Sequence, residues 1–184
     1  RKLDEDLDVV IISDYGKGVC TEENCRRMIE SCHTYGVPVV VDPKGTDWTK
    51  YAYADYITPN LKEINQVLAE PIHNEDRAVE VAAHYVMNRF NIRNVIVTRS
   101  EEGLSLIRDD ENVHIPTKAQ EVFDVSGAGD TVIAVFAMGL AGGMNPADSA
   151  YMANLAASVV VAKLGTYAVS REELMAVLKG EAEK

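Results

Sequence analysis

The feature that most constrains the fold is an alternation of short apolar runs with longer segments of helical periodicity. The runs are rich in Val and Ile, which is typical of strands buried on both faces of a sheet. We expect strands over Leu7–Ser13, Val37–Val41, Asp55–Thr58, Asn94–Thr98, Leu104–Ile107 and Val113–Ile115, the last two forming a hairpin around Asp109–Asn112. We expect helices over about Thr21–Tyr35, Leu61–Ala69, Asn74–Phe90, Ala128–Leu140, Pro146–Lys163 and Arg171–Leu178. The alternation predicts an α/β domain with a largely parallel sheet.

Two helix starts carry strong local signals. Asn145 followed by Pro146 combines a capping side chain with a proline in the first turn. Ser170 and Glu173 have the spacing of a capping box. Both signals support the predicted boundaries of the last two helices.

Composition and charge exclude several classes of protein. The 184 residues fit one domain or most of one, and the net charge of −11 argues against nucleic acid or an anionic membrane as a bulk partner. No apolar run is long enough to span a bilayer, and the first residues do not form a signal peptide. Because the chain begins with Arg1 and enters a strand almost at once, we expect it to be a piece of a longer protein.

The cysteines and histidines show no metal-site spacing. Cys20, Cys25 and Cys32 are odd in number, and Cys25, Met28, Ile29 and Cys32 fall on one helical stripe. We therefore expect buried, reduced thiols in a cytoplasmic protein. The four histidines are expected to be structural; they are His33, His73, His84 and His114.

The segment from Asp124 to Asp130 carries the most chemical information. Gly127, Ala128 and Gly129 leave backbone N–H groups free to converge on an anion where an apolar helix begins, and the helix dipole is positive there. Asp130 beside such a pocket could accept a proton from a hydroxyl while the pocket holds a phosphoryl group. A carboxylate in a first helical turn is also a common stabilising feature, so the pattern alone leaves both interpretations open. The chain contains no P-loop motif.

Loops after the first two predicted strands place lysines where a phosphate could bind. Asp14 could bind sugar hydroxyls with Lys17 near a phosphate, and Lys44 could reach a phosphate as a point charge. Taken alone, the first loop is better explained as a glycine-rich turn with solvated charges, and Lys44 as an ordinary surface residue of a turn.

Loops after the third and fourth predicted strands could bind a nucleotide. Asn60 and Glu63 could hold Mg²⁺ through waters, although their spacing is also that of a capping box, and the two roles are compatible. Thr98, Arg99 and Ser100 offer hydroxyl and guanidinium groups that suit phosphate oxygens, but they also fit a polar turn.

Taken in order, these segments resemble the ribokinase-like (PfkB) carbohydrate kinases over essentially the whole chain. The resemblance implies a three-layer α/β/α fold with a mostly parallel sheet, here incomplete because the family's N-terminal half and lid are absent. Residues 1–184 would then be the C-terminal, nucleotide-binding and catalytic part of a single kinase domain. ATP and Mg²⁺ are implied, as is a homodimer for the full-length protein.

The resemblance also implies roles for individual residues. Gly127, Ala128 and Gly129 would form the anion hole and Asp130 would be the catalytic base. The residues implied near ATP and its metal are Asn60, Leu61, Lys62, Glu63, Thr98, Arg99, Ser100, Gly103 and Asn154, with Lys163–Gly165 closing the adenine pocket. Asp124 and Ser126 match positions that hold a monovalent cation such as K⁺ in some members.

Four segments narrow the resemblance to the bacterial D-glycero-β-D-manno-heptose 7-phosphate kinases, which supply ADP-heptose for the lipopolysaccharide core. They are Ser13–Gly18, Val41–Asp47, Thr58–Leu61 and Lys163–Thr166. The implied reaction is ATP-dependent phosphorylation of the anomeric hydroxyl of this sugar phosphate. The alternatives are a kinase for another sugar or sugar phosphate and a non-catalytic nucleotide-binding module. We expect this chain alone to be inactive, because the lid that would exclude water is missing.

Overall fold

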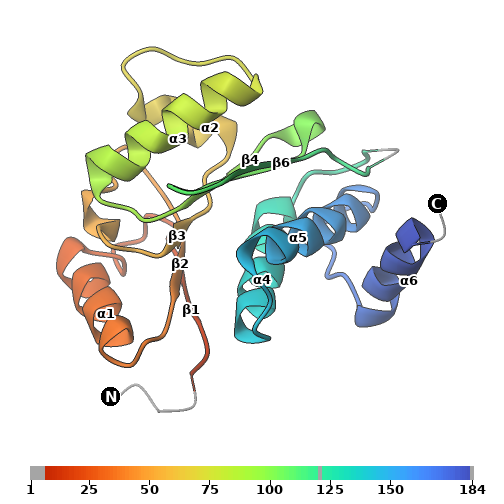
Figure 1. Ribbon diagram of the computed structural model, residues 1–184, viewed down its shortest axis with the longest axis horizontal. Coiled ribbons are helices and arrows are strands. Elements are labelled where there is room, and N and C mark those ends of the chain that lie inside the picture. Colours follow the sequence, from red (N-terminus) through yellow and green to blue (C-terminus); the bar gives the residue numbers. More distant parts are fainter. Residues whose placement is uncertain (1–6, 120–121, 183–184) are drawn as a thin grey trace.

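A computed structural model describes residues 7–119 and 122–182, which contain one six-stranded sheet with strand order β1-β2-β3-β4-β5-β6 (Figure 1). The strands are β1 (Val10–Ser13), β2 (Val39–Asp42), β3 (Tyr56–Ile57), β4 (Val95–Thr98), β5 (Leu104–Ile107) and β6 (Asn112–Ile115). The first four are mutually parallel, and β4, β5 and β6 pair in antiparallel fashion. The predicted parallel sheet and its terminal hairpin are therefore confirmed.

Helices cover both faces of the sheet. The first layer contains α1 (Glu22–Thr34), α2 (Leu61–Val67) and α3 (Asp76–Phe90). The second layer contains α4 (Ala128–Ala141), α5 (Pro146–Val161) and α6 (Arg171–Ala182), and Figure 1 shows the layers on opposite sides of the strands. Parallel neighbours connected by right-handed crossovers place α1 to α3 on one face, which leaves the other face for the C-terminal helices.

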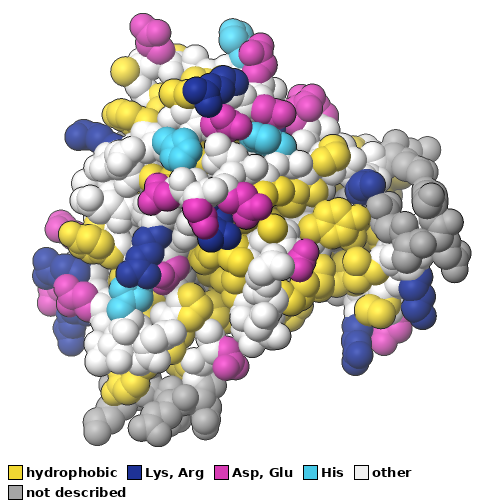
Figure 2. Space-filling model, in the orientation of Figure 1, with side chains coloured by type: hydrophobic (Ala, Val, Ile, Leu, Met, Phe, Trp, Pro, Cys, Tyr) yellow, Lys and Arg dark blue, Asp and Glu magenta, His cyan; other side chains and the backbone are white. Residues whose placement is uncertain are grey.

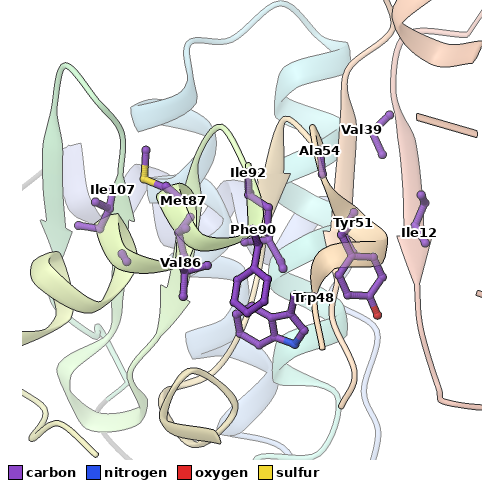
Figure 3. Packing of buried hydrophobic residues seen from close by; sticks show 14 of the residues in the cluster. Ile12, Val39, Trp48, Tyr51, Ala54, Val86, Met87, Phe90, Ile92 and Ile107 are labelled. Carbon is purple, nitrogen blue, oxygen red and sulfur yellow. The ribbon is translucent and has the colours of Figure 1, made fainter. Parts of the chain in front are cut away.

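Strand alternation divides the core into two parts. Val39 and Val41 of β2 point into the core beneath the first layer, whereas Val40 between them points toward α4 and α5. All three side chains are fully buried. In the first core Trp48 packs against Phe90 with ring centroids 5.8 Å apart (Figure 3). Hydrophobic burial at about 1.5–3 kcal/mol per large side chain holds both helical layers to the sheet.

Most predicted element boundaries are confirmed to within a few residues, and the differences have local causes. β1 begins at Val10 instead of Leu7, because it lies at the edge of the described sheet and follows the register of β2 from Val39 onward. Short 3₁₀ helices at Thr49–Tyr51 and Ser100–Glu102 were not predicted. Met28, expected on the apolar stripe of α1, is 41% exposed, so that part of the prediction is wrong.

The predicted helix caps are confirmed. The Asn145 side chain accepts a hydrogen bond from the Asp148 N–H at 2.8 Å, and Ser170 and Glu173 form the reciprocal capping box. Cys25 and Cys32 are buried free thiols, as expected, whereas Cys20 is only partly buried. Within the described ranges, no helix combines the length and the apolar character needed to cross a membrane.

Candidate active site

A small polar cavity of about 180 Å³ opens where the parallel strands end. It is lined by Asp42, Thr58, Asn60, Glu63, Thr98, Gly127, Gly129 and Asp130. Asp42 and Thr98 are the last residues of β2 and β4, and Thr58 directly follows β3. The carboxyl ends of parallel strands meet at one edge of a sheet, which explains why residues far apart in sequence converge here. The structure thus brings together Asn60, Glu63, Thr98 and the Gly127–Asp130 segment, as the sequence predicted.

The N-terminus of α4 forms one wall of the cavity. Gly127 precedes the helix with φ 80°, a left-handed conformation that glycine adopts readily, and it has no side chain with which to cap the helix. The Ala128 N–H bonds to the Val125 carbonyl at 3.2 Å, so this amide is already used in a turn. Asp130 is exposed at the cavity, and the Tyr15 hydroxyl lies 3.5 Å from its Oδ1. The helix start therefore presents backbone dipoles and one carboxylate to the cavity.

The N-terminus of α2 forms another wall of the cavity and, unlike that of α4, it is capped by side chains. Asn60 Oδ1 accepts the Glu63 N–H at 2.9 Å, and Glu63 Oε2 accepts the Asn60 N–H at 3.0 Å. The capping box left open by the sequence is therefore present, while both residues still line the cavity. The other oxygen of Glu63, Oε1, lies 3.8 Å from Lys44 Nζ. Leu61 packs against the core and Lys62 is exposed, so neither of these two predicted residues lines the cavity.

Asp42 is a cavity residue to which the sequence analysis gave no individual role. Burial, followed by the negative charges of Glu63 and Asp130, raises the pKa of its carboxyl group to about 6. The Ser13 hydroxyl, 3.5 Å away, partly offsets this rise. A position at the end of an apolar strand is the signal that could have identified Asp42.

The loop after β4 agrees with only part of what the sequence predicted for it. Thr98 lines the cavity, and its N–H bonds to the Pro59 carbonyl at 3.0 Å, which joins the loop to the segment before α2. Arg99, expected to face phosphate oxygens, is 2% exposed and bonds to Asn74, Asp76 and Ser105 instead. Ser100 is exposed. A Cβ on Gly103 would approach the Ile115 carbonyl to 2.2 Å, so packing accounts for that glycine.

Asp14 also has partners other than those expected. It is 4% exposed; its Oδ2 receives hydrogen bonds from Lys50 Nζ and the Tyr51 hydroxyl, both at 2.6 Å, and its Oδ1 receives one from the Gly16 N–H at 2.7 Å. Despite the opposing effect of burial, the bonds from Lys50, Tyr51 and Gly16 lower the pKa of this carboxyl group. Its carboxylate thus holds the loop after β1 in place instead of projecting toward a sugar. Lys17 and Lys44 are exposed on the two adjoining loops, where the sequence placed them.

The remaining predicted residues lie in the loop before α4, within α5 and in the loop that follows α5. Asp124 accepts the Ser126 N–H at 2.8 Å and the Gly165 N–H at 3.1 Å, which ties the loop before α4 to the loop after α5. The bonds from Ser126 are the main reason that the pKa of Asp124 is lowered. Asn154 is buried and donates to the Pro116 carbonyl at 2.9 Å, so its amide fixes backbone and does not project outward. Lys163 lies 3.6 Å from Glu173.

Sequence comparison identifies the family. The profile of the pfkB family carbohydrate kinases matches residues 2–173. The chain belongs to the pfkB family of carbohydrate kinases. It is 46% identical over 169 residues to the bifunctional protein HldE of Syntrophotalea carbinolica, and 47% identical over 176 residues to that of Trichlorobacter lovleyi. These matches cover 91% and 95% of this chain but only 34% and 36% of the relatives, so the chain spans about a third of their length.

Solved structures show that the pfkB chain has a ribokinase-like fold. A ribokinase from Thermotoga maritima superposes with a TM-score of 0.77 at 29% identity, covering 94% of this chain and 57% of that one. An Arabidopsis thaliana ribokinase complexed with ribose and ATP gives a TM-score of 0.82 at 21% identity, covering 95% and 57%. The predicted α/β/α architecture is therefore confirmed.

Proposed function

We propose that this chain supplies the nucleotide-binding and catalytic part of a kinase that transfers phosphate from ATP to the anomeric hydroxyl of D-glycero-β-D-manno-heptose 7-phosphate, giving the 1,7-bisphosphate. The observation that carries the proposal is the juxtaposition of Asp130 with the uncapped N-terminus of α4 at the cavity. Phosphoryl transfer needs little more from a protein than in-line positioning and stabilisation of charge. The carboxylate can position an alcohol group and accept its proton, and the helix N-terminus beside it can stabilise the charge of the phosphoryl group.

In the proposed reaction, Asp130 accepts the proton of the attacking hydroxyl group as that group bonds to the γ-phosphorus. The N–H groups of Gly127 and Gly129 hold the migrating phosphoryl group, whose bond to the β-phosphate oxygen breaks as ADP leaves. Ala128, whose N–H bonds to the Val125 carbonyl, does not take part. Exposure of Asp130 leaves its carboxylate accessible to a sugar hydroxyl. The Tyr15 hydroxyl lies near Asp130 Oδ1, so the loop after β1 adjoins the side of the cavity where the sugar hydroxyl would bind, the acceptor side.

The donor set at the cavity fits Mg²⁺. Asp42, Glu63 and Asp130 all line it, and after burial the negative charges of Glu63 and Asp130 contribute to the raised pKa of Asp42. Among the described residues, no group of three or more His, Cys, Asp or Glu side chains could hold a metal ion directly. Asn60, Glu63 and Asp42 would therefore hold Mg²⁺ through waters, where it neutralises triphosphate charge. Asp124 and Ser126 remain the predicted monovalent-cation residues.

The substrate assignment is supported by the loops at the acceptor side. Lys17 and Lys44 would meet the charge of the sugar phosphate or of the triphosphate. The segments that contain these lysines resemble heptose 7-phosphate kinases, and HldE proteins are among the chain's relatives. We expect the complete protein to be a homodimer and this chain alone to bind nucleotide weakly, with negligible turnover.

A substrate panel on the complete encoded protein tests the assignment. ATP consumption is measured with heptose 7-phosphate, ribose, fructose and fructose 6-phosphate in the presence of MgCl₂. We expect kcat/KM to be highest for the heptose phosphate, and phosphorus NMR of the product should show a new anomeric phosphate. Faster turnover of an unphosphorylated pentose or hexose would contradict the heptose assignment and favour a kinase for another sugar.

A further inference from the structure

We propose that Arg99 is a positioning residue that fixes the loop Thr98–Gly103 and thereby sets the affinity of the site for the triphosphate of ATP. This inference rests on the proposed function, because it assumes that the nucleotide's phosphates lie beside Thr98. Arg99 itself does not line the cavity. It would act through the backbone of the loop to which it belongs.

Arg99 is among the largest fully buried side chains of the described chain, although it carries a charge. Its guanidinium group donates to Asn74 Oδ1 at 2.9 Å, to Asp76 Oδ1 at 2.5 Å, to Ser105 Oγ at 3.0 Å and to the Asn74 carbonyl at 3.2 Å. In return, Asn74 Nδ2 donates to the Arg99 carbonyl at 2.9 Å. A buried cation is tolerated only when its donors are matched in this way. The side chain therefore clamps the loop to the start of α3 and to β5.

Hydrogen bonds with His114, and through it with Glu80, orient Ser105. The distance from Ser105 Oγ to His114 Nδ1 is 2.8 Å, and His114 Nε2 lies 3.0 Å from Glu80 Oε1. Because Ser105 Oγ accepts from Arg99, its own proton is free to go to His114 Nδ1, and the Nε2–H then donates to Glu80. This direction of donation extends the clamp to β6 and α3. In the described ranges, no buried side-chain nitrogen or oxygen lacks a hydrogen-bond partner.

The backbone of the loop needs such a restraint. Ser100 has φ 53°, a left-handed conformation that costs energy for a residue other than glycine. The loop closes on itself through the Arg99 N–H to the Gly103 carbonyl at 2.8 Å and the Gly103 N–H to the Ser100 carbonyl at 3.0 Å. Thr98, at the other end of this turn, reaches the cavity. Release of Arg99 would therefore let the loop relax at the edge of the phosphate site.

The same strand offers a matched control. Arg93 lies just before β4, and its NH1 pairs with Asp55 Oδ1 at 2.6 Å, whereas Arg99 lies just after the same strand. Both arginines bond to a carboxylate and hold a strand end. Arg93 and Asp55 do not line the cavity, so loss of this pair tests stability without touching the proposed nucleotide site.

The test compares Arg99→Met, Ser105→Ala and Arg93→Met in the complete encoded protein. Binding of Mg-ATP is measured by calorimetry without sugar, and amide hydrogen exchange is followed over residues 98–103. We expect Arg99→Met to raise the Kd for Mg-ATP about tenfold or more, since small misplacements at a phosphate site have large effects. Ser105→Ala should raise it about threefold, by loss of one hydrogen bond. Arg93→Met should lower the Tm but leave both the Kd and the loop exchange unchanged.

Kinetics separate positioning from loss of folded protein. Arg99→Met should raise the KM for ATP and leave the KM for the sugar unchanged, whereas a loss of folded protein lowers the apparent kcat alone. A wild-type Kd in folded Arg99→Met would overturn the inference, as would an equal effect of Arg93→Met. If Arg99→Met does not fold, Ser105→Ala decides, and an unchanged Kd together with unchanged loop exchange overturns it. Failure of the wild-type protein to bind Mg-ATP would contradict the proposed function itself.

Discussion

The helix starts at α2 and α4 face the same cavity but are built in opposite ways. At α2, Asn60 and Glu63 satisfy each other's backbone N–H groups, so the helix presents side-chain oxygens to the cavity. At α4, Gly127 offers no capping side chain, so the helix presents its backbone dipole. The first arrangement suits a hydrated cation and the second suits an anion. Together they create a polarity across the cavity that matches a metal-bound phosphate chain.

The two helical layers also differ in the kinds of side chain that they present at the surface. Figure 2 shows hydrophobic side chains gathered over α4 and α5, whereas charged side chains are more prominent over the first helical layer. The apolar character of α4 supports its role as a fixed element, because its buried residues include Val132, Ile133 and Phe136. A helix held firmly by its apolar face can keep a polar first turn at a defined place. The chemistry that we propose for α4 therefore lies at its N-terminal residues.

The largest effect is expected for the carboxylate at α4. Asp130→Asn should lower kcat about 10²- to 10⁴-fold, the usual contribution of a general base, while the Kd for Mg-ATP changes little. The matched control is Asp148→Asn, because Asp148 occupies the same first-turn position of α5, three residues after its cap Asn145. That variant should lose stability of at most about 1 kcal/mol and keep its activity.

Steady-state kinetics and calorimetry on the complete encoded protein measure both quantities. Near-normal phosphoryl transfer by Asp130→Asn would exclude Asp130 as the base of the proposed reaction.

A smaller effect is expected for Asp42, which lines the cavity together with the start of α2. Its replacement should raise the stability of the protein. The pKa of Asp42 is raised to about 6 from an ordinary value of 3.8, so folding becomes less favourable as the pH rises through this window and the carboxyl group ionises. Asp42→Asn should therefore stabilise the protein above pH 6 by about 1–2 kcal/mol without Mg²⁺, and change little at pH 4. Mg²⁺ should stabilise the wild-type protein more than the variant, and increasingly so above pH 6.

Urea unfolding at pH 4 and pH 8, with and without MgCl₂, checks this expectation. Asp109→Asn, at an exposed turn of the β5–β6 hairpin, serves as the control and should show no such pattern. Equal stability of wild type and Asp42→Asn at pH 8 would show that the charges at the cavity are already balanced.

The fold was predictable because its signals are local. Periodicity located the strands and helices, and their alternation indicated a largely parallel sheet. The order of the strands in the sheet comes from the structure alone. The cavity was predictable in the same way, since Asn60, Glu63, Thr98 and Gly127 all adjoin strand ends or helix starts. Asp42 satisfied the same rule and was missed as an individual site residue.

Side-chain direction was not predictable from the sequence. Asp14 and Arg99 both adjoin strand ends, yet each turns away from the expected ligand because distant residues meet it. Lys50 and Tyr51 bond to Asp14 from a 3₁₀ helix that was not predicted, and Asn74 and Asp76 bond to Arg99 from the start of α3. Such partners depend on long-range packing, which composition and spacing do not encode.

The smallest effect is expected for Gly127 and Gly129 at the start of α4, where glycine is needed for two different physical reasons. Gly127 has φ 80°, so alanine there is strained by about 1–2 kcal/mol. Gly129 has no left-handed backbone, and a Cβ built on it meets no described atom within 4 Å. Gly129→Ala should therefore stabilise α4 by about 0.5–1 kcal/mol, because alanine is the better helix former.

Gly129 nevertheless lines the cavity, so its added methyl group would occupy space that the proposed phosphoryl group needs. We expect Gly129→Ala to unfold at a higher urea concentration than the wild-type protein and to have a kcat/KM for ATP about tenfold lower, because the reacting phosphate is displaced. Gly127→Ala should unfold at a lower urea concentration. If Gly129→Ala were both more stable and fully active, space for a phosphate would not be the reason for glycine at this position. The anion would then have to bind elsewhere than against the first turn of α4.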